Sequence, residues 1–149
     1  MTAGMNALYD FAHKGGLPPF DAIAAEHVVP AVTKLLDELK ANKAQLEASV
    51  QPTWVGAVDA VADIVEPIER AWGAVSHLNA VKNSPALREA HQKAQPDVVA
   101  AMLDLAQSEP LHRALAALKD SPAYASLSDA RKRILDKKLL EAKLAGIAL

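Results

Sequence analysis

The chain has 149 residues, of which 51% are hydrophobic, 4% aromatic and 23% charged, and it contains no cysteine. This length fits one domain or one piece of a larger protein, and the absence of cysteine excludes a disulfide framework. Sixteen basic and eighteen acidic side chains leave a net charge of −2, so no field of one sign gathers nucleic acid or an anionic membrane. The most apolar window, 98–106, is broken by Asp104 and is too short to span a bilayer. We therefore expect a cytoplasmic protein that binds neither nucleic acid nor membrane.

The composition also predicts the fold class. With few aromatic residues, the core must consist of Ala, Val, Leu and Ile, with Trp54 and Trp72 as its large anchors. Abundant Ala, Leu, Glu, Lys and Gln favour helix, and no run of alternating β-branched residues indicates a strand. Short connections between long helices favour antiparallel neighbours. The predicted fold is all-α, an up-and-down array of four to five antiparallel helices with a long kinked second helix.

Residues 1–16 show weak periodicity and end in Lys14-Gly-Gly16. We predict a flexible N-terminal extension over 1–16, with a helix of one or two turns as the alternative, followed by a helical domain over 17–149. The segment Leu17-Pro-Pro-Phe20 is predicted to be extended, because each proline fixes its own φ and disfavours helix in the residue before it. Leu17 and Phe20 are expected to pin this segment onto the helices.

Two long helices are predicted next, each with an apolar face at helical spacing. The first runs over about 24–50, with Pro30 near its first turn. The second starts after Thr53 as its N-cap, and Pro67 in its middle predicts a bend near 63–66. The two apolar faces consist of Val28, Val32, Leu35, Leu39, Leu46 and Val50 in the first helix, and of Trp54, Val58, Val61, Val65, Ile68, Trp72, Val75 and Leu78 in the second.

Three further helices complete the predicted array. The third starts at Pro85 with Ser84 as N-cap, runs to about 107, and carries Pro96 as a second kink or break. A short fourth helix covers about 110–119, and 121–124 form a turn. The last helix is capped by Ser128. Its apolar residues are Ile134, Leu135, Leu139, Ala142 and Leu149, and its basic face is Arg131, Lys132, Arg133, Lys137, Lys138 and Lys143.

The histidines decide whether the chain carries a zinc-peptidase site. Such enzymes use H-E-x-x-H, which places two imidazoles and a general-base glutamate on one helix face. The motif occurs at none of the five histidines, which are His13, His27, His77, His91 and His112. We therefore predict no catalytic, cofactor-binding or metal-binding residues in this chain.

Other polar residues allow a chemical or a structural interpretation. His77 and His91 could face one another across the turn at Asn83 and Ser84 and bind a metal, but local hydrogen bonding is the favoured interpretation. Asn79 and Asn83 are interpreted as capping groups for the helix end. Acid–base work by the carboxylates Asp63, Glu66 and Glu69, and phosphate contact by Arg131, Lys132 and Arg133, are both less favoured than a solvated surface.

Several phrases of the sequence resemble one known family. They are L-P-P-F from Leu17, E-H-V-V-P-A-V-T-K from Glu26, S-H-L-N-A-V-K-N-S-P-A-L-R-E-A from Ser76, and L-A-G-I-A-L from Leu144. In this order they are similar to the N-terminal helical region of the thimet oligopeptidase family of zinc metallopeptidases, above all its oligopeptidase A-like members. The resemblance covers 17–149.

The resemblance implies a fragment of a longer peptidase. Family members have two mainly helical halves flanking a deep channel that admits short peptides, with zinc held at its floor by H-E-x-x-H and a further glutamate. This region would form part of one channel wall, with the catalytic half of the chain as its partner and all zinc ligands beyond Leu149. One apolar helix face would then stay exposed, and self-association of the chain through it is expected. The alternative is a free-standing helical module that binds a peptide or a partner helix without catalysis.

Overall fold

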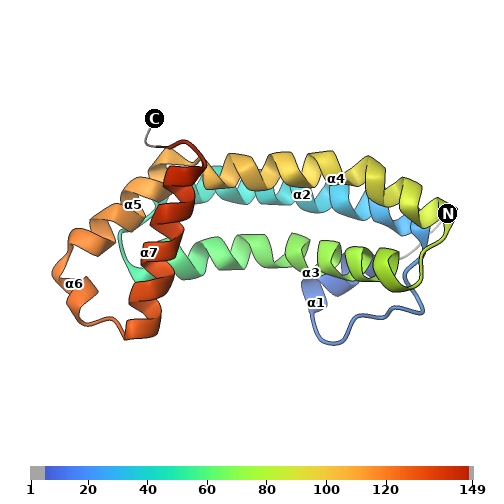
Figure 1. Ribbon diagram of the computed structural model, residues 1–149, viewed down its shortest axis with the longest axis horizontal. Coiled ribbons are helices and arrows are strands. Elements are labelled where there is room, and N and C mark those ends of the chain that lie inside the picture. The colour runs from blue at the N-terminus through green and yellow to red at the C-terminus, as the bar shows by residue number, and fades with distance from the viewer. Residues whose placement is uncertain (1–5, 148–149) are drawn as a thin grey trace. The chain divides into compact units, whose positions relative to one another are not determined.

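The computed structural model describes residues 6–147, and all regular structure within them is helical (Figure 1). The predicted all-α class is confirmed. The chain divides into two compact units, each assembled from two separate stretches of sequence. Unit 1 consists of Met1–Lys40 and Val65–Ala100, and unit 2 consists of Ala41–Ile64 and Ala101–Leu149.

The five predicted helices are all present. They correspond to α2, to the π-helical segment η1 together with α3, and to α4, α5 and α7. Two short helices, α1 and α6, accompany them, and α6 occupies most of the predicted 121–124 turn. In chain order the elements are α1 Ala7–Lys14, α2 Ala25–Ser49, η1 Trp54–Asp59, α3 Ala60–Val81, α4 Pro85–Ala106, α5 Glu109–Asp120, α6 Pro122–Ala125 and α7 Asp129–Leu144.

The predicted N-caps hold their helices as expected. The hydroxyl of Thr53 accepts the Gly56 N–H at 3.0 Å, that of Ser84 accepts the Leu87 N–H at 3.2 Å, and that of Ser128 accepts from the third residue of α7. Each bond satisfies one of the free amide groups at a helix start.

The prolines interrupt the helices less than predicted. Because α2 begins at Ala25, Pro30 lies in its second turn rather than its first. The helical assignments of α3 and α4 continue through Pro67 and Pro96, so Pro96 does not break α4. One lost backbone hydrogen bond is tolerated where flanking side chains are buried, as they are on both sides of these two prolines. The predicted bends stay predictions.

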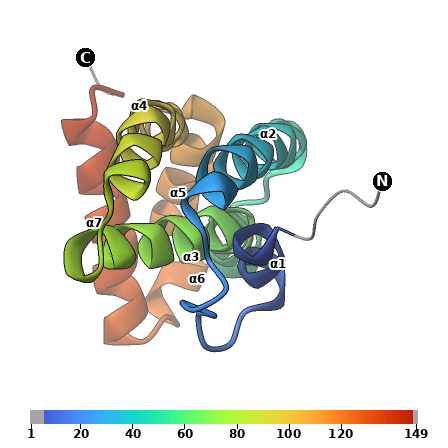
Figure 2. The ribbon, with the colours of Figure 1, turned by 90° about the vertical axis from the view of Figure 1, so that its right-hand side faces the viewer.

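Unit 1 packs α1 against the parts of α2 and α3 that belong to it (Figure 2). Asn6 caps α1, whose Leu8 is fully buried. The Tyr9 hydroxyl donates to Glu38, and the Arg70 guanidinium donates to the Ala12 carbonyl at 3.2 Å. The short-helix alternative thus describes 7–14, while 1–5 lie outside the described residues and the boundary after Gly16 stays a prediction.

The L-P-P-F segment departs from its prediction. Leu17 is 93% exposed, so it does not pin the segment, and α1 supplies Leu8 and Phe11 to the core instead. Phe20 does make a contact, since the centroid of its ring lies 5.3 Å from that of the His77 ring.

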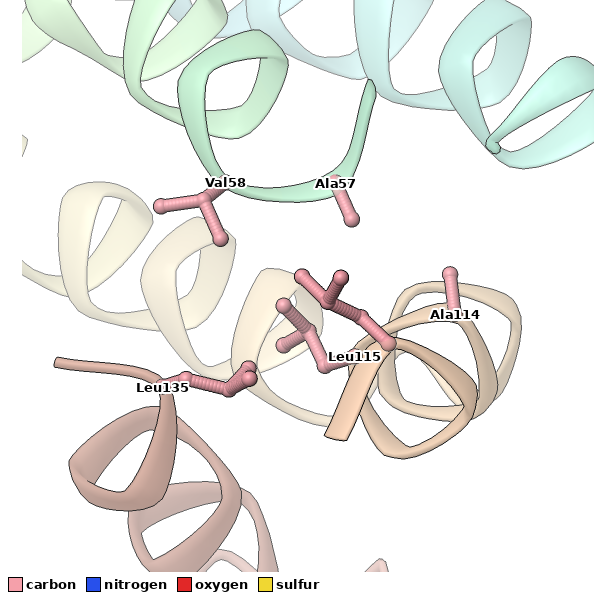
Figure 3. Packing of buried hydrophobic residues seen from close by; sticks show 6 residues of the cluster. Ala57, Val58, Ala114, Leu115 and Leu135 are labelled. Carbon is pink, nitrogen blue, oxygen red and sulfur yellow. The ribbon is translucent and has the colours of Figure 1, made fainter. Parts of the chain in front are cut away.

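Unit 2 has a core where η1, α5 and α7 meet (Figure 3). Ala57 and Val58 face α5 and Leu135 of α7 across this core, and Trp54 packs at its edge. Ile134 was expected among the apolar residues of the last helix but is 43% exposed, because Leu135, one residue and about 100° further round the helix, takes the inward position. The other expected apolar residue, Leu149, lies outside the described residues. The buried cluster consists of Ala57, Val58, Ala114, Leu115, Leu118 and Leu135.

Candidate functional site: an apolar pocket in unit 2

A pocket of about 220 Å³ opens beside the unit 2 core. Five elements line it, and every lining residue belongs to unit 2. They are Ala57 and Val61 from η1 and α3, Met102, Leu105 and Ala106 from α4, Ser108 before α5, Leu111, His112 and Leu115 from α5, and Lys138, Glu141 and Ala142 from α7.

Small side chains create this space. Ala57, Ala106 and Ala142 stand on three different elements, each at a lining position where a larger residue would reach into the pocket. A cavity of about 150 Å³ lined by apolar residues holds a molecule of the size of benzene. The pocket therefore has room for one large apolar group.

Polar groups stand among the lining residues as well. Glu141 is exposed, whereas His112 and Lys138 are half-buried. Glu141 pairs with Lys137 one turn earlier, at 3.6 Å and in solvent, where such a pair contributes little. An apolar group with a polar or charged end thus matches the lining.

A buried hydroxyl fixes the start of α5 at the pocket. Ser108 is 5% exposed, and its Oγ accepts the Leu111 N–H at 3.4 Å and donates to Glu47 Oε1 at 2.6 Å. Glu47 also lies 3.0 Å from Lys43 Nζ, which in turn lies 2.9 Å from Asp104. This network ties α2 to the junction of α4 and α5.

The same contacts shift two ionisation equilibria. The hydrogen bond from Ser108, with help from Lys43, lowers the pKa of Glu47 in spite of its partial burial. Burial opposes the charge on Lys43, but its bonds to Asp104 and Glu47 outweigh burial and raise its pKa. Both groups are thus held in their charged forms near neutral pH.

The end of α7 is also fixed beside the pocket. Gly146, at φ +100°, closes the helix, with the Ile147 N–H donating to the Ala142 carbonyl at 3.2 Å and the Gly146 N–H to the Lys143 carbonyl at 3.1 Å. This pair of bonds is the Schellman arrangement, which glycine favours. The Gln107 amide donates to the Ala145 carbonyl at 2.8 Å, so the α4–α5 junction and the end of α7 are joined.

The histidines make local contacts. His91 stacks on Trp72 with ring centroids 4.5 Å apart, and its Nε2 lies 3.3 Å from Ser76 Oγ. Local hydrogen bonding, the favoured interpretation, thus describes His91, whereas for His77, which packs on the Phe20 ring, it stays a prediction. His13 Nε2 lies 3.0 Å from Glu38 in unit 1.

The other polar predictions have mixed outcomes. The capping role of Asn79 and Asn83 is wrong: Asn83 binds the Arg88 side chain, and the buried Oδ1 of Asn79 has no hydrogen-bond partner among the described residues. Ser84 caps the helix instead because its shorter side chain follows directly after the turn. The solvated surfaces are confirmed, since the acidic cluster 63–69 and the basic run 131–133 lie largely exposed. Within that run Arg131 covers the Trp54 ring, 4.8 Å from its centroid.

Zinc does not fit the described part of the chain. Between residues 6 and 147, no three His, Cys, Asp or Glu side chains are grouped closely enough to hold a metal ion. The donors stand apart and have other partners: His27 Nδ1, for example, accepts the Ala24 N–H at 3.1 Å. No catalytic step is therefore assigned to a metal on these residues.

The pocket was not predicted from the sequence. Its residues come from three stretches of the chain, 57–61, 102–115 and 138–142, and helical periodicity reports only which face of one helix is buried. The sequence shows alanine at 57, 106 and 142, but nothing in it relates these three positions to one another.

The fold and the pocket define a class first: an all-α protein whose described helices include none long and apolar enough to cross a membrane. Comparison with known proteins then shows the family. Residues 32–149 match the family Neurolysin/Thimet oligopeptidase, N-terminal domain, and the chain belongs to this family.

Three longer relatives are each named oligopeptidase A. The chain is 44% identical over 132 residues to organellar oligopeptidase A, chloroplastic/mitochondrial, of Arabidopsis thaliana, and 42% identical over 132 residues to a probable cytosolic oligopeptidase A of that plant. It is 40% identical over 134 residues to oligopeptidase A of Escherichia coli. Each comparison covers 89% of this chain but only 17%, 19% and 20% of the relative, so the chain spans about a fifth of their length.

Proposed function

We propose that this chain is the non-catalytic N-terminal domain of an oligopeptidase A-like zinc metalloendopeptidase that hydrolyses short peptides in the cytoplasm. The observation that carries the proposal is the family match over 32–149, supported by three relatives named oligopeptidase A. The domain forms part of the wall of the peptide channel, and zinc and its ligands come from the catalytic part of the longer chain.

A chimera tests this proposal. In E. coli oligopeptidase A, the matched N-terminal fifth is replaced by this chain, and hydrolysis of a quenched fluorescent peptide of about ten residues is measured. The references are the E. coli protein without its N-terminal fifth and this chain alone. We expect the chimera to hydrolyse the peptide at least about tenfold faster than either reference, and a zinc chelator to abolish the activity.

One result of the chimera experiment would contradict the proposed function. A chimera that is folded by circular dichroism but no more active than the shortened protein would contradict the proposal. Binding of the same peptide to this chain alone, in that case, would favour the free-standing peptide-binding module.

A further inference from the structure

We propose that the unit 2 pocket is a docking site for an apolar side chain of the segment that follows this domain in the longer peptidase. The inference rests on the proposed function and adds the place of contact and the chemistry of the partner.

The volume and lining of the pocket are the first support. About 220 Å³ bounded by Val61, Met102, Leu105 and Leu111 is more than a well-packed interior leaves empty, and it matches one large aliphatic or aromatic side chain. Within unit 2, the exposed Ala106 and Glu141 belong to its lining, so an outside group can enter.

The course of the chain end is the second support. Ala142 lines the pocket, and its carbonyl accepts the Ile147 N–H. Ala106 and Ser108, which also line the pocket, flank Gln107, which holds the Ala145 carbonyl. Residue 147 therefore lies beside the pocket, and a segment that follows needs only a few residues, at up to about 3.5 Å each, to reach it.

An exposed apolar residue of α4, Leu103, is the third support. Leu140 and Leu144 of α7 are 55% and 77% exposed, and Leu103 of α4 is 49% exposed. Leu140 and Leu144 are one helical turn apart and form one exposed stripe. At about 100° per residue this stripe faces away from Lys138, Glu141 and Ala142, so among the three only Leu103, next to Met102, can be covered by a segment that fills the pocket.

The relatives favour the following segment over other occupants. They are about five times as long as this chain, and the matched part is an N-terminal domain, so most of such a protein follows it. A segment attached close to the pocket has a high effective concentration there, which neither a free peptide nor a second copy has.

Methionine NMR tests the inference on the intact 149-residue chain. Met102 lines the pocket and is the sole methionine among the described residues, so its labelled methyl group is a specific probe that the Met102→Leu variant identifies. The added probes are synthetic peptides of about 20 residues, each long enough for a helix of about 30 Å. They tile the E. coli oligopeptidase A sequence beyond the matched fifth, and a scrambled version of each is the control.

We expect the first peptides after the matched part to shift the Met102 methyl signal and to leave the indole signal of Trp72, in unit 1, unchanged. Ala106→Phe should fill the mouth of the pocket from an exposed position and weaken binding at least about tenfold. Ala117→Phe is the matched control, because Ala117 is exposed on α5 and does not line the pocket. Should Ala106→Phe fail to fold, Ala106→Leu makes the same test with a smaller group.

Three outcomes would overturn the inference: no peptide shifts Met102, scrambled peptides shift it equally, or binding survives both Ala106 variants. A Met102 shift that depends only on the concentration of the chain would identify a second copy as the occupant. The chimera reports peptide hydrolysis separately. If the chimera is active but no peptide shifts the Met102 methyl signal, the docking site is rejected and the proposed function stands.

Discussion

Unit 1 and unit 2 bury their large side chains to different degrees. Among residues 6–147, six of the eight largest fully buried side chains lie in unit 1, and only Leu118 and Leu135 lie in unit 2. Unit 2 instead carries the pocket and three small lining alanines. The six in unit 1 are Leu8, Val28, Val32, Leu35, Ile68 and Val75.

The difference shows where the chain completes its own core and where it leaves room. In unit 1, α1 supplies Leu8 and is held to α2 and α3 by Tyr9 and Arg70. In unit 2, a hydrogen-bonded network around Ser108 holds the helix start in place while the apolar space beside it stays open. The packing of unit 2 thus leaves a place that an added group can fill.

The largest expected effect comes from the unit 1 core. Ile68→Ala removes a side chain that is 1% exposed, and we expect it to lower the free energy of unfolding by about 2–5 kcal/mol. Met102→Ala, at the open pocket, should cost less than about half as much because Met102 is only half-buried. Urea unfolding measures both, and equal losses would contradict the contrast between the units.

A smaller effect, dependent on pH, is expected at the start of α5. Ser108→Ala removes the N-cap and the hydrogen bond to Glu47, and should cost about 1–2 kcal/mol at pH 7. Because Ser108 lowers the pKa of Glu47 below its ordinary value of 4.5, the charged form stabilises the fold above that value. This stabilisation is lost as the pH falls through the lowered pKa.

The variant should therefore flatten the decline in stability between about pH 5 and pH 3, seen in thermal unfolding at several pH values. Ser128→Ala is the matched control, since Ser128 caps α7 and no carboxylate is recorded on its hydroxyl. Ser128→Ala should lower stability without changing its pH dependence. If the stability of Ser108→Ala declined below pH 5 as steeply as that of the original chain, the pKa of Glu47 would not depend on Ser108.

The smallest expected effects concern one glycine in each unit. Gly73→Ala, inside α3 and with no atom within 4 Å of the added methyl group, should stabilise unit 1 by about 0.5–1 kcal/mol. In unit 2, a methyl group on Gly56 would lie 2.9 Å from both the Gln51 carbonyl oxygen and Thr53 Oγ1, so Gly56→Ala should destabilise by about 1 kcal/mol. Thermal unfolding distinguishes the two signs, and a stabilising Gly56→Ala would refute the close approach at η1.

Local chemistry accounts for what the sequence could predict. Thr53, Ser84 and Ser128 cap their helices because a hydroxyl reaches a free amide only two or three residues away, a relation visible in the sequence. Helical spacing likewise identified Val65, Ile68 and Val75 as core residues, and the family phrases identified the family.

Long-range packing determines the features that the sequence could not predict. The exposure of Leu17 depends on α1, which supplies Leu8 and Phe11 to the core in its place. The pocket depends on alanines that the fold brings together from positions 57, 106 and 142. None of these relations repeats at a helical period, so no single stretch of sequence contains them.

The order in which the two units' stretches occur along the chain has a consequence for synthesis on the ribosome. Both stretches of unit 1 have been made once residue 100 is added, whereas residues 41–64 of unit 2 must wait for 101–149. At 5–20 residues per second, those 49 residues take roughly 2 to 10 seconds. During that interval Trp54 and Val58 lack the α5 and α7 side chains that cover them in the finished fold.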